Sequence, residues 1–157
     1  MTKIVKKKVT KKKGTKVVQS KKTVYKGIEF ASSLEATMCK LLDEAGISYK
    51  YEPKSYTTLE TFTYEGECYE RVRKTSKEMV DRPKVLGVSY TPDFVGLNEE
   101  FFIEVKGRAN ESFPLRWKLF KEMLMNTRKE MPILFKPMTV ADCKQVVEIL
   151  KSKGYGK

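Results

Sequence analysis

Apolar residues recur at helical spacing in three stretches of the chain, which predicts three helices. The first begins after Ser32, whose side chain can cap it, and ends at Gly46. The second has Pro114 in its first turn, and the third begins after Thr139 and ends before Gly154. The positions predicted to face the core are Leu34, Met38, Leu41, Leu42 and Ala45, then Leu115, Leu119, Phe120, Met123 and Leu124, then Val140, Cys143, Val146 and Leu150.

Shorter apolar runs between these helices predict strands. Residues 90–97 and 101–105 flank the polar pair 98–99, so they most simply form an antiparallel hairpin. Residues 47–52 alternate as a strand, and residues 131–135 form a short buried strand before the last helix. The order helix, strands, helix, strand, helix predicts an α/β fold, with a mixed central sheet and helices on its faces.

The predicted hairpin at 90–105 carries the candidate chemistry. Side chains alternate between the two faces of a strand, so Phe102, Glu104 and Lys106 share one face. Folding the hairpin back brings Asp93, at its open end, near Glu104. Two carboxylates beside a lysine suit a hard divalent ion such as Mg²⁺. The alternative is an ordinary ion pair between Glu104 and Lys106 on a solvated face.

Around these residues the sequence resembles the PD-(D/E)xK nuclease superfamily. Its signature is a Pro-Asp, a variable gap and a Glu-x-Lys, which Pro92-Asp93 and Glu104-Val105-Lys106 match. The upstream block V-Y-K-G-I-E-F-A-S-S-L-E-A and the downstream block F-P-L-R-W-K-L-F-K are similar to the phage endonuclease I-like family, which includes Holliday-junction resolvases. The resemblance covers about residues 24–125 and leaves an unmatched insertion at about 57–86.

The resemblance implies a restriction-endonuclease-like αβ sandwich and a metal-dependent endodeoxyribonuclease. It implies that Asp93, Glu104 and the backbone carbonyl of Val105 hold one Mg²⁺, for which Mn²⁺ can substitute. By the same resemblance Glu35 helps to hold a second ion, and Lys106 orients the attacking water or stabilises charge on the scissile phosphate. A homodimer would be needed to cut both strands of a junction. From the residues alone, Glu35 could instead complete a capping box with Ser32.

Charge is concentrated at the start of the chain. The net charge is +12, and ten of the lysines lie within residues 1–22, ahead of the first acid, Glu29. Such an arm suits contact with phosphate backbones, although a solubilising or targeting tail has the same composition. We therefore expect a basic arm at 1–23 and one nuclease domain at 24–157. The residues predicted to contact DNA are Lys6, Lys7, Lys8, Lys11, Lys12, Lys13, Arg116, Lys118 and Lys121.

The insertion at 57–86 is predicted to contain a hairpin of residues 56–64 and 68–72, with Gly66 in its turn. The basic residues that follow it are Arg71, Arg73, Lys74, Lys77, Arg82 and Lys84. Two interpretations are open: a solvated loop, or a basic flap over DNA beside the active site. Glu52, at the end of the strand before the insertion, is a further candidate acid near the metals.

The residue types that the chain contains and lacks exclude several catalytic mechanisms. The chain has no histidine, which excludes Ser-His-Asp and Cys-His catalysis and nucleases with a histidine base. Cys39, Cys68 and Cys143 lack metal-site spacing and are expected to be reduced thiols. The chain has no apolar run of membrane-spanning length, so we expect no membrane partner and a cytoplasmic protein, in the host cytoplasm if phage-encoded.

These features predict a Mg²⁺-dependent DNA endonuclease that hydrolyses phosphodiester bonds, acting on branched or Holliday-junction DNA. One alternative is a nuclease of the same fold that acts on linear or single-stranded DNA. The other is a non-catalytic DNA-binding or packaging protein that keeps the fold.

Overall fold

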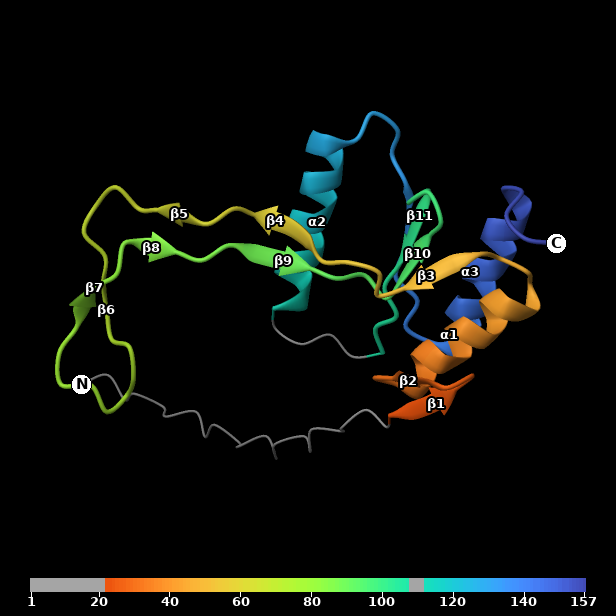
Figure 1. Ribbon diagram of the computed structural model, residues 1–157, viewed down its shortest axis with the longest axis horizontal. Helices are drawn as coiled ribbons and strands as arrows, with labels where there is room; N and C mark the ends of the chain where they lie inside the picture. Colours follow the sequence, from red (N-terminus) through yellow and green to blue (C-terminus); the bar gives the residue numbers. More distant parts are fainter. Residues whose placement is uncertain (1–21, 108–111) are drawn as a thin grey trace, which may run out of the picture.

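The computed structural model describes residues 22–107 and 112–157, which form a mixed α/β fold with three helices and several small sheets (Figure 1). The helices are α1 (Ser33–Glu44), α2 (Phe113–Thr127) and α3 (Val140–Ser152). The strands are β1 (Thr23–Tyr25), β2 (Ile28–Phe30), β3 (Tyr49–Tyr51), β4 (Tyr56–Leu59), β5 (Phe62–Thr63), β6 (Tyr69–Glu70), β7 (Val80–Asp81), β8 (Lys84–Val85), β9 (Val88–Tyr90), β10 (Phe94–Gly96), β11 (Phe101–Ile103) and β12 (Ile133–Phe135).

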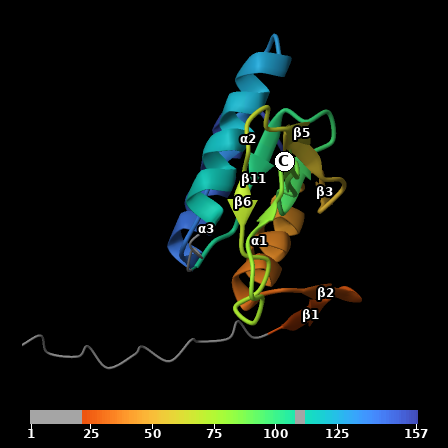
Figure 2. The same ribbon diagram turned by 90° about the vertical axis from the view of Figure 1, so that its left-hand side faces the viewer.

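A mixed four-stranded sheet in the order β12-β11-β10-β3 forms the centre of the molecule. Strand β10 pairs antiparallel with both β3 and β11, whereas β11 and β12 are parallel. Helices α1 and α3 cover one face of this sheet and α2 covers the other, as Figures 1 and 2 show. The predicted mixed sheet with helices on its faces is therefore confirmed at this level.

Strand β11 divides the interior into two cores, one on each side. Phe101, Ile103 and Val105 pack with α1 and α3, while Phe102 packs with Trp117 and Phe120 of α2. The predicted alternation of this strand is thus confirmed. Both faces are covered by helices here, so the face that bears Glu104 is not a solvated one.

The three helices lie where their periodicity predicts them, with two positions in error. Leu115 is 62% exposed, because α2 turns its larger side chains Phe113 and Trp117 toward the sheet. Val140 is 47% exposed at the first position of α3, ahead of the turns that pack on α1. Among the described residues, no helix is both long and apolar enough to cross a bilayer. The three cysteines are free thiols, as expected.

The predicted strand 90–97 is wrong because two strands occupy it. Strand β9 ends at Tyr90 and pairs with β4, and β10 begins only at Phe94. Pro92 lies between them and cannot donate a ladder hydrogen bond, so the chain leaves one sheet and enters another there. The turn that follows is tight, with Glu99 at a φ of 61° and its N–H donating to the Gly96 carbonyl at 2.9 Å.

The insertion folds as an extended two-stranded arm, and the predicted hairpin within 56–72 is wrong. Strands β4, β5 and β6 all lie on the outgoing limb, and β9, β8 and β7 pair with them antiparallel on the return limb. The turn lies between Glu70 and Val80, beyond the predicted Gly66. In Figure 1 the arm projects away from the three helices. The insertion is therefore not an irregular loop, and its interpretation as a basic flap over DNA beside the active site stays a prediction.

A second hairpin, of β1 and β2, was not predicted. Its turn is Lys26-Gly27, with φ angles of 49° and 78°. Two central residues at positive φ are typical of the tight turns that match the twist of antiparallel strands. The short runs Thr-Val-Tyr and Ile-Glu-Phe on either side of Lys-Gly carry the sequence signal for this hairpin.

Candidate active site

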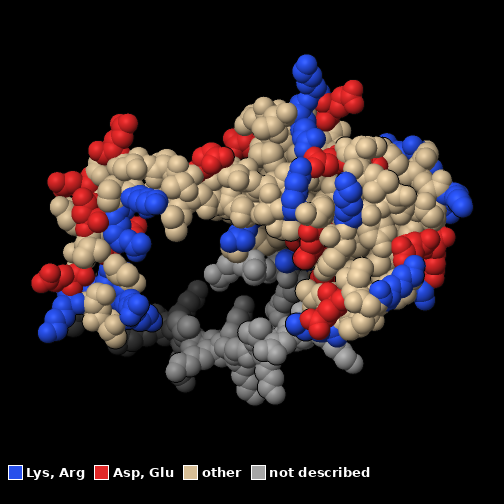
Figure 3. Space-filling model, viewed as in Figure 1, with Lys and Arg blue, Asp and Glu red and all other residues tan. Residues whose placement is uncertain are grey.

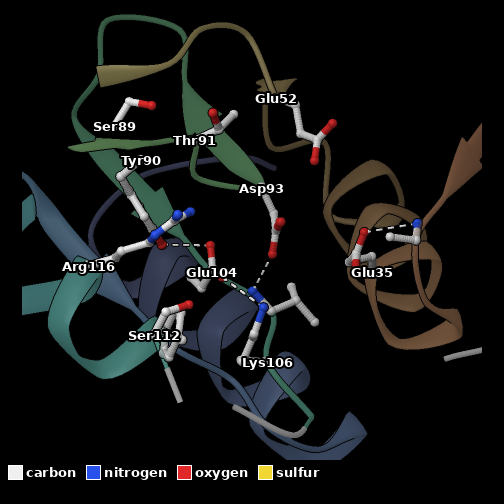
Figure 4. Close-up of a pocket in the computed structure, with 13 residues that line it drawn as sticks. Glu35, Glu52, Ser89, Tyr90, Thr91, Asp93, Glu104, Lys106, Ser112 and Arg116 are labelled. Carbon is white, nitrogen blue, oxygen red and sulfur yellow. Dashed lines mark hydrogen bonds and ion pairs between the residues drawn. The ribbon is translucent and has the colours of Figure 1, made fainter. Parts of the chain in front are cut away.

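A pocket of about 350 Å³ lies beside the ends of β9 and β11, between the start of α1 and the start of α2 (Figure 4). Four acidic side chains line it, together with one lysine and one arginine. They are Glu35, Glu52, Asp93 and Glu104, with Lys106 and Arg116. The pocket thus gathers all four predicted catalytic side chains, which come from α1, the segment before β10 and the segment after β11.

Asp93 is held by main-chain N–H groups of two neighbouring segments, one directly after β3 and one after β11. Its carboxylate oxygen Oδ2 accepts a hydrogen bond from the Val105 N–H at 2.6 Å. Its backbone carbonyl accepts from the N–H of Glu52 at 2.8 Å. The preceding Pro92 is fully buried, which leaves the segment little freedom to move. Asp93 is therefore fixed beside the strand that carries Glu104, as the hairpin prediction required.

Glu104 is buried, with 5% of its surface exposed. Its oxygen Oε2 accepts a hydrogen bond from the Tyr90 hydroxyl at 2.6 Å, and its Oε1 lies 3.7 Å from the Lys106 Nζ. The Lys106 Nζ also lies 5.1 Å from the centroid of the Phe113 ring. An ion pair on a solvated face is excluded, because a buried carboxylate loses hydration that only its partners can replace.

Glu35 lies on the far side of the pocket in the first turn of α1 and is also buried (Figure 4). Its carboxylate accepts from the Ser32 hydroxyl at 2.7 Å, the Ala31 N–H at 3.2 Å and the Tyr51 hydroxyl at 3.0 Å. The Ser32 hydroxyl caps the Glu35 N–H, but the return bond goes to Ala31. The predicted capping box is therefore only half formed, and the carboxylate faces the pocket.

Burial and like charges raise the pKa values of the two central carboxyls. Burial contributes most to the raised pKa of Asp93, and the neighbouring Glu104 and Glu35 raise it further. The Val105 N–H and Lys106 oppose this rise. Burial also raises the pKa of Glu104, against the hydrogen bond from Tyr90 and the charge of Lys106. Ionisation of both carboxyls thus has an electrostatic cost, which a bound cation would remove.

Asp93 and Glu104 can form the donor set for one magnesium ion. Asp93 and Glu104 supply carboxylate oxygens on one side of the pocket, and Mg²⁺ commonly binds one or two carboxylates and keeps several waters. Among the described residues, no group of three or more cysteine, aspartate or glutamate side chains converges closely enough to hold a metal ion. Glu35 therefore lines the same pocket without joining Asp93 and Glu104 in one ligand cluster.

The predicted DNA contacts divide into three groups. Arg116 lines the pocket beside Tyr90 and Ser112, on the side opposite Glu35 (Figure 4). Lys118 and Lys121 are exposed on α2 outside the pocket, and the Lys121 Nζ lies 5.4 Å from the centroid of the Trp117 ring. Lys6, Lys7, Lys8, Lys11, Lys12 and Lys13 lie outside the described residues.

With this geometry in place, we compared the chain with known proteins. No family model, curated protein or solved structure matches it. Function must therefore be argued from the residues of the pocket themselves.

Two tyrosines at the site were not identified from the sequence. The Tyr90 hydroxyl donates to Glu104 and the Tyr51 hydroxyl to Glu35, so each fixes one predicted ligand. Burial raises the pKa values of both hydroxyls, which therefore stay protonated and act as donors at neutral pH. The sequence signal was the position of each in a short strand, Tyr90 two residues before Pro92 and Tyr51 directly before Glu52. Tyrosines at such positions more often pack in a core, as the rings of these two also do.

Proposed function

We propose that this protein is a metal-dependent endonuclease that hydrolyses phosphodiester bonds in DNA. The observation that carries the proposal is the carboxylate pair of half-buried Asp93 and buried Glu104, with Lys106 3.7 Å from Glu104 at the wall of an open pocket. Two like charges withdrawn from water are unfavourable unless a cation compensates them. A pocket with both carboxylates and cations can receive a divalent ion together with a phosphate.

Each residue has a role that its position allows. Asp93, Glu104 and the carbonyl of Val105 would hold Mg²⁺, or Mn²⁺ in its place. The bound ion would act as a Lewis acid on the phosphate. Lys106, which is partly exposed to the pocket, would orient the attacking water or stabilise charge on the scissile phosphate. Arg116 would bind a phosphate oxygen at the opposite wall, and Glu35 would hold a second ion or a water.

The resemblance to endonuclease I-like resolvases favours branched DNA as substrate, and a restriction-endonuclease-like sandwich as the finer description of the fold. The sheet with helices on both faces supports this description. Cleavage of both strands of a junction needs two sites and hence a homodimer, and such an enzyme would act in the cytoplasm where the DNA lies. A nuclease of the same fold acting on linear or single-stranded DNA remains the first alternative.

A non-catalytic DNA-binding protein is the second alternative, and the pocket argues against it. Lysine and arginine side chains bind phosphate without help from carboxylates. Four acidic side chains around one pocket would repel DNA, unless a cation neutralises them. The arrangement is therefore costly for a protein that only binds DNA and useful for one that also binds a metal.

The test uses the full chain with Mg²⁺ on a four-way junction, on a linear duplex with the same arm sequences, and on single strands. We expect cleavage that requires the metal and is fastest on the junction. Equal cleavage in EDTA would exclude the metal mechanism. Binding of all three substrates without cleavage in either Mg²⁺ or Mn²⁺ would favour the non-catalytic alternative.

A further inference from the structure

The β-arm, which we define as residues 57–89, has no core of its own. Of these residues, all of which the structure describes, none is buried. Its strand pairs are short, with two pairs of residues each between β5 and β8 and between β6 and β7. Isolated two-stranded ribbons are marginally stable in water, and both of their edges can pair with another chain. The β-arm therefore lacks what normally stabilises a sheet.

Large apolar side chains are concentrated on the β-arm. Eight of the seventeen exposed large hydrophobic residues among the described residues lie on it. They are Leu59, Phe62, Tyr64, Tyr69, Val72, Met79, Val80 and Leu86. Figure 3 shows uncharged side chains between the charged ones along its length. A concentration of exposed apolar residues on one element is typical of an interaction surface.

Charge on the β-arm is segregated along the chain. The outgoing limb, residues 57–70, carries four acidic side chains and no basic one. The tip, residues 71–77, carries four basic side chains and no acidic one. Within the arm, which is described throughout, no ion pair of 4.0 Å or less joins these groups. The two charge clusters thus remain available to a partner.

We propose that the partner of the β-arm is the β-arm of a second copy of this chain. In a dimer with two-fold symmetry the same patch meets itself in the opposite direction. Two arms side by side and antiparallel would place the basic tip of each against the acidic limb of the other. Their apolar side chains would then be covered at the same contact. Opposite charges at both ends of such a contact fix its direction and register.

DNA is a poorer partner for the β-arm. Residues 57–86 contain six basic and six acidic side chains, so the arm has no positive excess. A surface that binds phosphates without sequence preference needs such an excess. The inference locates the homodimer of the proposed function but does not depend on catalysis, because self-association is measured without DNA or metal.

The test is sedimentation equilibrium of the full chain and of two charge-reversed variants. One carries Glu60→Lys, Glu65→Lys and Glu67→Lys, and the other carries Arg71→Glu, Lys74→Glu and Lys77→Glu. We expect the wild-type protein to sediment at twice its chain mass of 18.2 kDa. Each variant alone should sediment at the chain mass, because its tip and limb then repel the same parts of another copy. An equimolar mixture should regain the doubled mass.

A matched control reverses three charges elsewhere on the surface, with Lys144→Glu, Lys151→Glu and Lys153→Glu at exposed positions of α3 and its C-cap. This variant should remain a dimer. All variants should keep the wild-type circular dichroism spectrum, because none of the substituted residues is buried.

Three outcomes would overturn the inference: a wild-type protein at the chain mass, single variants that remain dimers, or a mixture that stays at the chain mass. Cleavage of DNA by a wild-type monomer would reject the arm contact and leave the proposed nuclease intact. A protein whose dimer dissociates in the variants, but which cleaves no DNA, would support the arm contact and reject the proposed nuclease.

Discussion

The pocket buries charged side chains, whereas the β-arm exposes large apolar ones, and both patterns are unusual in a folded protein. At the pocket, Glu35 and Glu104 are charged residues with 7% and 5% of their surface exposed. On the β-arm, Phe62 and Leu86 are large apolar residues with 46% and 70% exposed. Charged residues are seldom fully buried without a partner, and large apolar patches are seldom left exposed. We therefore propose that each region binds something, a cation and phosphate at the pocket and a second protein surface at the β-arm.

The largest effect is expected from removal of the proposed metal ligands. Asp93→Asn and Glu104→Gln should each lower the cleavage rate at least about a hundredfold, and Lys106→Ala should do likewise. Thermal stability without metal should hold or rise in the two acid variants, because loss of one carboxyl removes the electrostatic cost of ionising the pair. Cleavage rates and melting curves measured together test both statements. Glu122→Gln, on the exposed face of α2, is the control and should cleave at the wild-type rate.

A smaller effect is expected from Tyr90→Phe, which removes the hydroxyl that fixes Glu104. Loss of such a supporting hydrogen bond typically costs about 10–100-fold in metal affinity or activity. The Mg²⁺ concentration for half-maximal cleavage should therefore rise, with DNA binding unchanged. Tyr49→Phe is a matched control, because its hydroxyl contacts Asp43 and Cys39 outside the pocket. An equal rise in both variants would contradict a positioning role for Tyr90.

These two regions also differ in how far sequence predicted them. The resemblance to the PD-(D/E)xK pattern predicted that Asp93, Glu104 and Lys106 lie together, and the structure brings them to one pocket. The resemblance did not identify Tyr90 or Tyr51, whose bonds to Glu104 and Glu35 span 14 and 16 residues. Such contacts depend on how elements pack, which local periodicity does not encode.

The β-arm was missed for a different reason. Alternation predicts that residues near Tyr69 are extended, but it does not choose Asp81 as the partner of Tyr69. Pairing register is strongly specified where one face of a sheet is buried, and the β-arm has no buried residue to supply that signal. Helices α1 to α3, by contrast, each bury a stripe, and their positions followed from it with errors only at single residues such as Leu115.

Glu35→Gln distinguishes two roles of Glu35 at the edge of the pocket, as a metal ligand and as part of the cap of α1. The Gln carbonyl oxygen can still accept from the Ala31 N–H, and its amide NH2 can donate to the Ser32 hydroxyl oxygen, so stability should fall by less than about 1 kcal/mol. If the Glu35 carboxylate holds a metal or a water, the cleavage rate should fall while the melting temperature changes little. A wild-type cleavage rate in this variant would assign Glu35 to the helix cap alone.

The smallest effect on cleavage is expected at Glu99, in the turn between β10 and β11, where the expected change is in stability. Its carboxylate accepts from the Tyr56 hydroxyl of β4 at 2.9 Å, pairs with Lys54 at 2.5 Å, and pairs with Arg128 after α2. Burial alone would raise the pKa of Glu99, but the hydrogen bonds from Lys54, Arg128 and Tyr56 outweigh it and lower the pKa to about 2. Glu99 therefore stabilises the fold when it is ionised.

Because ionised Glu99 stabilises the fold, its contribution to the free energy of unfolding depends on pH. A carboxyl with a lowered pKa in the folded state stabilises the protein above its ordinary value of 4.5, and the stabilisation is lost as pH falls toward about 2. Glu99→Gln should therefore lower the free energy of unfolding at pH 7 by about 1–2 kcal/mol, a range that allows for solvent screening of Lys54. The difference from wild type should shrink steadily between pH 4.5 and about 2 in denaturant titrations. A difference that stays constant across that range would show that Glu99 acts through packing and not through its charge.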